Sequence, residues 1–520
     1  MYHFQCDKET AIVKTTRGRI RGYLQEGVYI FKGVPYARAR RFEAPEPVDA
    51  WDGVRNCTSF GYCAPLLEFP VPNGELLVAH RYWPMDENCQ NLNLWTPGLD
   101  DAKRPVLVWL HGGGYESGSA IEHQAYEGEN MARIGDVVSI SVNHRLNVLG
   151  YMDLSDFGER FANSGNCGGD DLVAALKWIH ENVAKFGGDP DNVTIFGQSG
   201  GGGKVTTLLQ TPAADGLYAK AFNMSGIFKP HTAIPALHGS GREMGEHLMA
   251  ECGVKSIDEL QKVPFYFLAQ AYRKWKPRML AEGKNCGDSP FANGYYVGDP
   301  FDVGFRRETA GIPMLIGSVY SEFPSFNESD FDKHALSEEE QTRMLTDTLG
   351  EDNAGALIPL MHQAYPNRPI IDLLQIDIMF RPAIIEYVKL RAAVNTETYV
   401  YLFNHDMAID GGRAPWHCSD IPYIFHNAAM VQTTQDADVD ALESNMFDML
   451  MAFARTGKPG HPGIPSWPGC TPDTENTMLI DGPGWKVRPN HDHALLEHYV
   501  PVYAPIFDAA MEKTMEKVQH

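Results

Sequence analysis

The stretch Asn192-Val-Thr-Ile-Phe-Gly-Gln-Ser-Gly-Gly201 decides the fold of this chain. Its first half, Val193 to Phe196, is β-branched or aromatic and predicts a short buried strand. A helix is predicted from Lys204 onward. Between the two, the sequence fits the pattern G-x-S-x-G, which places Ser199 on a sharp strand-to-helix turn with its hydroxyl exposed. Glycines are needed on both sides of this turn because a Cβ there would clash with the neighbouring strand and helix.

Strand and helix patterns alternate around this stretch. Two apolar runs, Val106 to Leu110 and Val137 to Val142, are typical of strands covered on both faces. Between them, the sequence around Met131 predicts a helix. The apolar residues of 171–183 share one helix face, and residues 221–224, 313–316 and 398–403 predict further strands. This alternation indicates the α/β class, with a mostly parallel central sheet flanked by helices.

The rest of the chain is predicted to surround this sheet. Residues 11–36 and onward to about 100 predict short strands and loops, with an irregular loop between Cys63 and Cys89. Residues 230–310 and 325–395 are richer in Met and aromatics and predict helical insertions over the sheet and the site. Residues 505–518 predict an amphipathic helix. Since no Ser/Pro-rich linker separates these parts, we expect residues 1–520 to form a single domain.

Composition limits the class of function. The chain has 44 Lys and Arg against 67 Asp and Glu, a net charge of −23, which argues against nucleic acid and anionic membranes as partners. No apolar run approaches the roughly 18 residues that span a bilayer, and the N-terminus has no signal-peptide pattern. With nine cysteines and no C-x-x-C pair, we expect reduced thiols and a cytoplasmic protein. The oligomeric state is left open between monomer and homodimer.

A serine at such a turn needs a base to take its proton and an acid to orient that base. On this kind of fold the chain order is serine, acid, histidine. Glu322 follows the predicted strand at 313–316, and His417 lies in a later loop. From the residues alone, Asp420 remains a rival for the acid. Cys418 is a weak alternative nucleophile, because adjacent side chains usually diverge and no anion-binding motif precedes it.

A second motif is His111-Gly112-Gly113-Gly114, directly after a predicted strand. Backbone N–H groups of Gly113 and Gly114, with that of Gly200, would form a three-donor oxyanion hole. His111 is expected to brace the loop. The pair Gly203-Lys204 resembles the end of a phosphate-binding loop, but Gln198 and Val205 stand where that motif needs Gly and Ser or Thr.

Four motifs in order give a resemblance that covers nearly the whole chain. They are Phe31-Lys-Gly-Val-Pro-Tyr-Ala37, Glu87-Asn-Cys-Gln-Asn-Leu-Asn-Leu94, Asn143-His-Arg-Leu-Asn-Val-Leu-Gly150 and Phe186-Gly-Gly-Asp-Pro-Asp-Asn-Val-Thr-Ile-Phe-Gly-Gln-Ser199. Together they resemble the type-B carboxylesterases of the carboxylesterase/cholinesterase family. The resemblance implies the α/β-hydrolase fold and ester hydrolysis through an acyl-enzyme, with no metal or cofactor.

The resemblance also implies roles for single residues. It makes Ser199 the nucleophile, Glu322 the acid and His417 the base, and it places the oxyanion hole at Gly113, Gly114 and Gly200. Ser225 matches a supporting serine beside this site. The alternative role for Ser225 is to cap the end of a strand. Asp420 takes the position of a structural acid in the family, which lowers it as a triad candidate.

Some positions depart from the family pattern. Gln198 replaces the usual Glu before the nucleophile, which removes a buried negative charge and makes quaternary-ammonium esters less suitable substrates. Gly200 replaces the usual Ala, and Phe323 brings a bulky ring next to the acid. The family's first disulfide would join Cys63, or less probably Cys57, to Cys89. The second lacks a partner for Cys252, in keeping with a reducing compartment.

The sequence offers three candidate residues for the wall of the substrate pocket. Tyr115, Trp83 and Phe323 are candidate pocket walls, and an aromatic wall would favour small or aryl esters. An amidase, lactonase or thioesterase could use the same triad. A more remote alternative is a non-catalytic adhesion protein, which the intact triad argues against.

Overall fold

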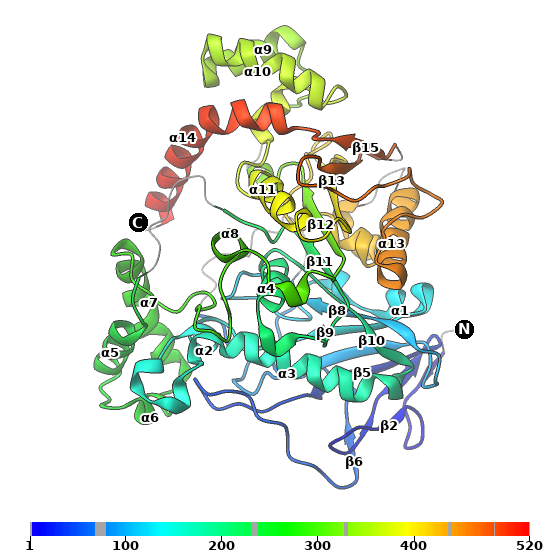
Figure 1. The fold of residues 1–520 in the computed structure, drawn as a ribbon, viewed down its shortest axis with the longest axis vertical. Coiled ribbons are helices and arrows are strands. Elements are labelled where there is room, and N and C mark those ends of the chain that lie inside the picture. Colours follow the sequence, from blue (N-terminus) through cyan, green and yellow to red (C-terminus); the bar gives the residue numbers. More distant parts are fainter. Residues whose placement is uncertain are drawn as a thin grey trace.

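The computed structural model describes residues 3–67, 80–229, 238–326, 331–434, 439–482 and 484–518. Within them, twelve strands form one sheet in the order β1-β4-β5-β7-β9-β8-β10-β11-β12-β13-β14-β15 (Figure 1). Strands β2, β3 and β6 form a small second sheet. The strands are β1 (Phe4–Gln5), β2 (Ile12–Lys14), β3 (Arg19–Arg21), β4 (Tyr23–Gln25), β5 (Val28–Pro35), β6 (Val54–Asn56), β7 (Asn91–Thr96), β8 (Arg104–Leu110), β9 (Val138–Val142), β10 (Gly188–Gln198), β11 (Lys220–Met224), β12 (Met314–Val319), β13 (Thr398–Phe403), β14 (Asn476–Ile480) and β15 (Lys486–Pro489).

The centre of the main sheet is parallel. Each neighbouring pair from β9 through β8, β10, β11, β12 and β13 to β14 is parallel, and the outer pairs are antiparallel. Strand β8 shows why its sequence is apolar throughout. Val106 and Val108 belong to the core on one face, and Leu107 and Trp109 belong to the core on the other. The mostly parallel sheet with helices on both faces confirms the predicted fold class.

The helices cover the two faces of the sheet and its edges. They are α1 (Glu129–Gly135), α2 (Asn147–Tyr151), α3 (Cys167–Asn182), α4 (Gly200–Leu209), α5 (Arg242–Glu251), α6 (Ile257–Leu260), α7 (Phe265–Ala281), α8 (Pro300–Val303), α9 (Glu338–Leu349), α10 (Glu351–Ala364), α11 (Arg381–Ala392), α12 (Ile421–Ile424), α13 (Val439–Thr456) and α14 (His493–Val518). Residues of α3, α4 and α11 pack into one core cluster, and residues of α12 and α13 pack into the opposite one. The two clusters therefore clamp the parallel strands from both sides.

The two predicted insertions do not form a single cap. Helices α5, α6 and α7 lie together at the lower left of Figure 1, and α9 and α10 lie at the top. Residues 230–237 and 327–330 of these insertions, and 68–79 of the predicted irregular loop, lie outside the described residues. Helix α14 begins at His493, earlier than predicted. The prediction took Pro505 as a helix start, whereas Pro501 and Pro505 both lie inside this helix.

The predicted turn at Ser199 is present. Strand β10 ends at Gln198, α4 begins at Gly200, and Ser199 between them has φ 57° and ψ −127°, a strained conformation for a residue with a side chain. A Cβ on Gly201 would lie 1.9 Å from the carbonyl oxygen of Leu110 on β8. A Cβ on Gly200 would lie 2.2 Å from the Gly114 oxygen, and one on Gly202 would lie 2.4 Å from the Asn223 side chain. Close packing against β8, the loop that follows it and β11 therefore excludes larger residues at 200–202, although glycine has a low helix propensity.

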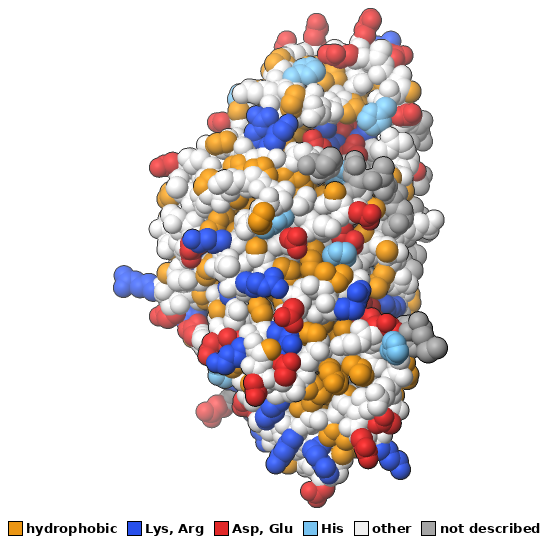
Figure 2. All heavy atoms as spheres, turned by 90° about the vertical axis from the view of Figure 1, so that its right-hand side faces the viewer, with side chains coloured by type: hydrophobic (Ala, Val, Ile, Leu, Met, Phe, Trp, Pro, Cys, Tyr) orange, Lys and Arg blue, Asp and Glu red, His pale blue; other side chains and the backbone are white. Residues whose placement is uncertain are grey.

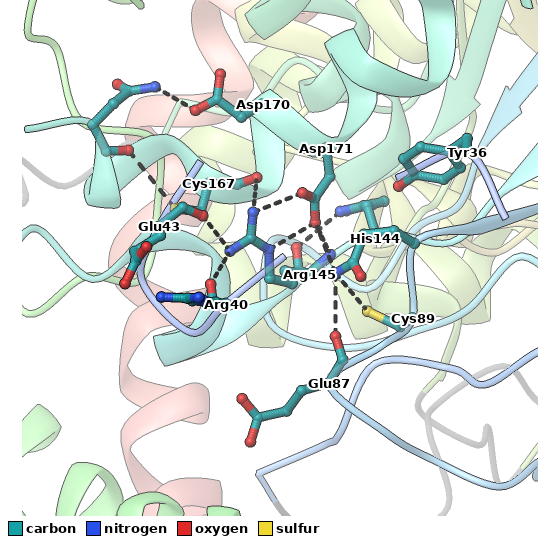
Figure 3. A network of polar contacts seen from close by, with 12 residues as sticks. Tyr36, Arg40, Glu43, Glu87, Cys89, His144, Arg145, Cys167, Asp170 and Asp171 are labelled. Atoms are coloured by element: carbon teal, nitrogen blue, oxygen red, sulfur yellow. Dashed lines mark hydrogen bonds and ion pairs between the residues drawn. The ribbon is translucent and has the colours of Figure 1, made fainter. Parts of the chain in front are cut away.

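A buried ion pair joins the loop after β9 to α3 (Figure 3). The guanidinium of Arg145 donates to both carboxylate oxygens of Asp171, at 2.7 and 2.9 Å, and both side chains are at most 2% exposed. Arg145 also donates to the carbonyl oxygens of Arg40, Glu43 and Cys167. Three segments of the chain, which are residues 40–43, the loop after β9 and α3, therefore meet at one guanidinium.

Replacing Asp171 with asparagine is expected to lower the free energy of unfolding by about 3–5 kcal/mol, because it leaves the Arg145 charge buried and unpaired. Urea unfolding followed by circular dichroism measures the loss. The matched control is Asp49→Asn, which removes an exposed partner of Arg38 and should cost less than about 1 kcal/mol. Equal losses in the two variants would contradict this account.

All nine cysteines are free thiols in the structure, so the disulfide implied for Cys63 (or Cys57) and Cys89 is not formed. All three side chains are buried. Burial raises the pKa of the Cys63 thiol to about 11, and burial next to Asp171 raises that of Cys89 well above its usual value. Both thiols are therefore held in the protonated form, which is unreactive toward oxidation.

The surface carries both signs of charge. On the face shown in Figure 2, acidic and basic side chains are interspersed with apolar ones. Among the described residues, no helix combines the length and the apolar character needed to cross a membrane.

Candidate active site

The predicted site residues meet at one edge of the sheet. Ser199 follows β10, Ser225 follows β11 and Glu322 follows β12. The glycine loop that begins at His111 follows β8, and the loop that holds His417 follows β13. Because all five strands are parallel, their carboxyl ends bring these residues together, and this edge is where α/β sheets place their ligands.

Glu322 and His417 are in direct contact. Their Oε2 and Nδ1 atoms are 2.5 Å apart, and the backbone N–H of His417 donates to the carbonyl oxygen of Glu322 at 3.1 Å. The other carboxylate oxygen, Oε1, accepts from the Ser225 hydroxyl at 2.6 Å and from the Val319 N–H at 3.1 Å. Glu322 is fully buried. Its two oxygens are thus both used, one to hold the acid in place and one to orient the imidazole.

Three residues around the Glu322–His417 contact have strained backbone conformations. Glu322 has φ 49°, Ser225 has φ 43° and Cys418 has φ 76°, all in the left-handed region that residues with a Cβ rarely adopt. Such strain persists only where the surrounding structure determines the conformation, and it clusters at functional sites. Cys418 occupies the position after the histidine.

Gln198 and Cys418 pack beside the imidazole. The Gln198 amide nitrogen lies 3.3 Å from Nε2 and 3.5 Å from Nδ1 of His417, and the Cys418 thiol donates to the Gln198 amide oxygen at 3.0 Å. The thiol is therefore turned toward the amide, which argues against Cys418 as a nucleophile. Within the described residues, the Ser199 hydroxyl makes no hydrogen bond to His417. Catalytic hydrogen bonds often tighten only when substrate binds.

Two further buried carboxyls lie near Glu322. Asp420, the rival acid, accepts from the Tyr401 hydroxyl at 2.6 Å and makes no hydrogen bond to His417. Burial raises the pKa of Asp420 to about 7, against the lowering effect of that hydrogen bond and with a contribution from the charge of Glu322. Asp377, which the sequence did not indicate, has its pKa raised to about 7 by burial and by Glu322. Near neutral pH both carboxyls are therefore partly protonated, which limits the negative charge around the imidazole.

The glycine loop presents free backbone donors. Gly113 and Gly114 have φ values of 83° and 61°, which glycine adopts without strain. In the described part of the chain, the N–H groups of Gly113, Gly114 and Gly200 find no hydrogen-bond acceptor. Gly114, Gly200 and Ser199 line the same cavity. The arrangement offers these three N–H groups to a negatively charged oxygen near the Ser199 hydroxyl.

That cavity has a volume of about 320 Å³, and six of the described residues that line it are aromatic. Its lining includes Tyr115 as predicted, and Ile227, Phe228, Tyr296, Asp299, Phe301, Phe380 and Tyr387, which the sequence did not indicate. These residues come from loops and from α8 and α11, where no motif marks them. Neither α5–α7 nor α9–α10 contributes to the lining formed by the described residues.

The structure places the other two candidate wall residues elsewhere. Trp83 lines a different hollow together with Tyr82 and Met85, and its ring packs edge-on against Phe60. Phe323 is not among the residues that line the cavity, and its ring centroid lies 4.6 Å from that of His417. Phe380 packs on His417 as well, at 5.2 Å, and it does line the cavity. The two phenyl rings therefore shield the imidazole from water.

The sequence profile of the carboxylesterase family matches residues 9–495. The chain is 30% identical over 488 residues to para-nitrobenzyl esterase of Bacillus subtilis, covering 90% of this chain and 94% of that protein. It is 32% identical over 519 residues to phenmedipham hydrolase of Pseudarthrobacter oxydans, covering 92% and 98%.

A solved structure resembles the chain more strongly. It is an esterase from the anaerobe Clostridium hathewayi, described as able to hydrolyse aliphatic aromatic polyesters. That structure is 45% identical, has a TM-score of 0.93, and is covered over 100% of its length by 96% of this chain. A thermophilic PNB esterase matches with a TM-score of 0.72 at 28% identity, over 94% of this chain and 99% of that one. These neighbours share the α/β-hydrolase fold that the resemblance implied.

Proposed function

The chain belongs to the carboxylesterase family and is a carboxylic ester hydrolase, and we propose that it works through an acyl-enzyme formed on Ser199. His417 takes the serine proton as the oxygen attacks the ester carbonyl, and it then protonates the leaving alcohol. Glu322 orients the imidazole and stabilises its positive charge. Water then repeats the sequence on the acyl-enzyme. The contact that carries this proposal is the 2.5 Å Glu322–His417 hydrogen bond behind the turn of Ser199.

We propose that the oxyanion hole is formed by the N–H groups of Gly113, Gly114 and Gly200. Gly114 and Gly200 line the cavity together with Ser199, and Gly113 directly precedes Gly114. No described residue accepts a hydrogen bond from these three N–H groups. Preorganised backbone donors of this kind stabilise the charge that develops on the carbonyl oxygen in the transition state. Ser225 supports the acid through its 2.6 Å hydrogen bond, and Gln198 packs against the base.

The substrates are proposed to be small and aryl esters. A volume of about 320 Å³ lies at the small end of ligand pockets, and six of the fifteen described residues that line it are aromatic. Related proteins support aromatic substrates, since one is named para-nitrobenzyl esterase and another is described as hydrolysing aliphatic aromatic polyesters. Gln198 in place of a carboxylate gives the site no negative charge next to the serine for a cationic ester.

A panel of chromogenic substrates tests this proposal. The p-nitrophenyl esters from acetate to palmitate and p-nitrophenyl benzoate are compared with p-nitroacetanilide, the matched amide of the acetate. We expect high kcat/KM for acetate, butyrate and benzoate, and a steep fall toward palmitate because the cavity cannot hold the long chain. Equal turnover of the anilide would favour an amidase, and a maximum at palmitate would contradict the small pocket.

A further inference from the structure

Helix α4 carries a buried lysine next to the glycine loop. The Lys204 side chain is 1% exposed, and its ammonium donates to two backbone carbonyl oxygens, those of His111 at 2.8 Å and Gly114 at 2.9 Å. These carbonyls stand at the two ends of the loop whose N–H groups are the proposed oxyanion donors. Buried lysines are rare because desolvating the charge is costly. A specific role is therefore to be expected.

The other carbonyls of the loop have partners within the loop itself. The oxygen of Gly112 lies 2.9 Å from the Nδ1 atom of His111, and the oxygen of Gly113 accepts from the N–H and the hydroxyl of Ser117. Lys204 is thus the element that connects the loop's remaining two carbonyls to the body of the protein. All four carbonyls of the loop thus have partners, whereas the N–H groups of Gly113 and Gly114 find no acceptor among the residues that the structure describes.

Gly200 lies one helical turn before Lys204 and faces the same loop. A Cβ on Gly200 would lie 2.2 Å from the Gly114 oxygen and 2.4 Å from the Gly114 nitrogen. The absence of that Cβ allows the loop to approach α4 closely enough for Lys204 to reach Gly114. Gly200 and Lys204 lie four residues apart on one face of α4, and both are next to Gly114.

We propose that Lys204 is a positioning residue for the oxyanion hole, which ties both ends of the glycine loop to α4 so that the N–H groups of Gly113 and Gly114 stay aimed at the reacting carbonyl. This role rests on the proposed function of Ser199 and the glycine loop. Lys204 itself does not line the cavity, so it acts through the loop and not on the substrate.

The tether does not depend on the charge of the lysine. Burial lowers the pKa of Lys204 to about 7, and Glu122 opposes this shift. Of the other groups that face it, His111 and His144 have pKa values lowered well below normal by burial, and burial raises the pKa of Tyr115 to about 12, so these three stay neutral near pH 7. A neutral amine retains two N–H groups, as many as the two carbonyls need. Loop positioning should therefore persist across pH 7.

Lys204→Met tests the proposal, since methionine has a similar length and no donors. We expect kcat for p-nitrophenyl acetate to fall on the order of 10²-fold, because loosely placed donors cost about that much, while KM changes less than about threefold. The ratio of wild-type to variant kcat should stay constant from pH 6 to pH 9. Hydrogen exchange of peptides covering residues 110–118 should become faster. The control is Lys220→Met, a buried lysine on β11 bound to Asn192, which should change none of these.

Gly200→Ala tests the same tether in a protein that keeps Lys204, so it can be used if Lys204→Met does not fold. Its methyl group should push Gly114 away from Lys204, lower kcat and make hydrogen exchange of residues 110–118 faster. Where Lys204→Met folds, the losses of the two variants should not add in the double variant, because both act on one loop. Additive losses, a kcat within threefold of wild type in Lys204→Met, or a ratio that follows a titration near pH 7 would overturn the role of Lys204. Ser199→Ala distinguishes a failure of the proposed function from a failure of the role of Lys204. If that variant is active, the proposed function fails; if it is inactive while Lys204→Met is normal, only the present inference fails.

Discussion

Replacing Ser199 with alanine is expected to lower kcat for p-nitrophenyl acetate by about 10⁴- to 10⁶-fold, with the fold and the free energy of unfolding nearly unchanged. The hydroxyl is the only atom group removed, and no described residue receives a hydrogen bond from it. The residual rate should come from the free N–H groups of the glycine loop and from binding. The steady-state rate of ester hydrolysis, corrected for the uncatalysed rate, measures the loss of kcat.

Covalent labelling of the serine hydroxyl is a second test of Ser199→Ala. A fluorophosphonate should add one phosphonyl group to the wild-type protein, and mass analysis of peptides should place it on Ser199. Ser199→Ala should remain unlabelled. The control is Ser240→Ala, whose hydroxyl donates to Asp156 outside the cavity and which should be labelled and active like the wild type. An alanine variant that keeps more than about 1% of the activity would mean that another group is the nucleophile.

Replacing Glu322 with glutamine is expected to lower kcat by about 10³- to 10⁴-fold, with little change in KM. The reason lies in the contacts of the two carboxylate oxygens. Oε1 accepts from Ser225 and Val319, so the glutamine oxygen should occupy this place. Its NH₂ group then faces Nδ1 of His417 and forces that nitrogen to accept. The imidazole would carry its proton on Nε2, the wrong tautomer for a base toward Ser199.

The matched variant is Asp420→Asn, which tests the acid that sequence alone had left as a rival. Asp420 is bound to Tyr401 and not to His417, so we expect kcat to fall less than about tenfold. Steady-state kinetics of both variants at pH 8 compare the two carboxyls directly. A larger loss in Asp420→Asn than in Glu322→Gln would assign the orienting role to Asp420.

Much of this architecture was predictable because its signals are local. The turn at Ser199, the buried strands β8 to β13 and the glycine loop each follow from residue types within a short window. The structure differs from the predictions where local signals compete with packing. Helix α14 begins well before Pro505, and four glycines form the start of α4.

By itself, then, the sequence determined the fold class, the strand-to-helix turn at Ser199 and the family, since periodicity and motif order need no knowledge of distant contacts. Only the tertiary structure decided where Trp83 and Phe323 lie, which aromatic residues line the cavity, and that Lys204 ties the glycine loop to α4. It also brings Glu322, the acid that the resemblance implied, into contact with His417. The contacts of His417 and Lys204 join segments 90 or more residues apart. A side chain's partner across such a separation depends on how parallel strands and helices pack, and no pattern within the chain encodes it locally.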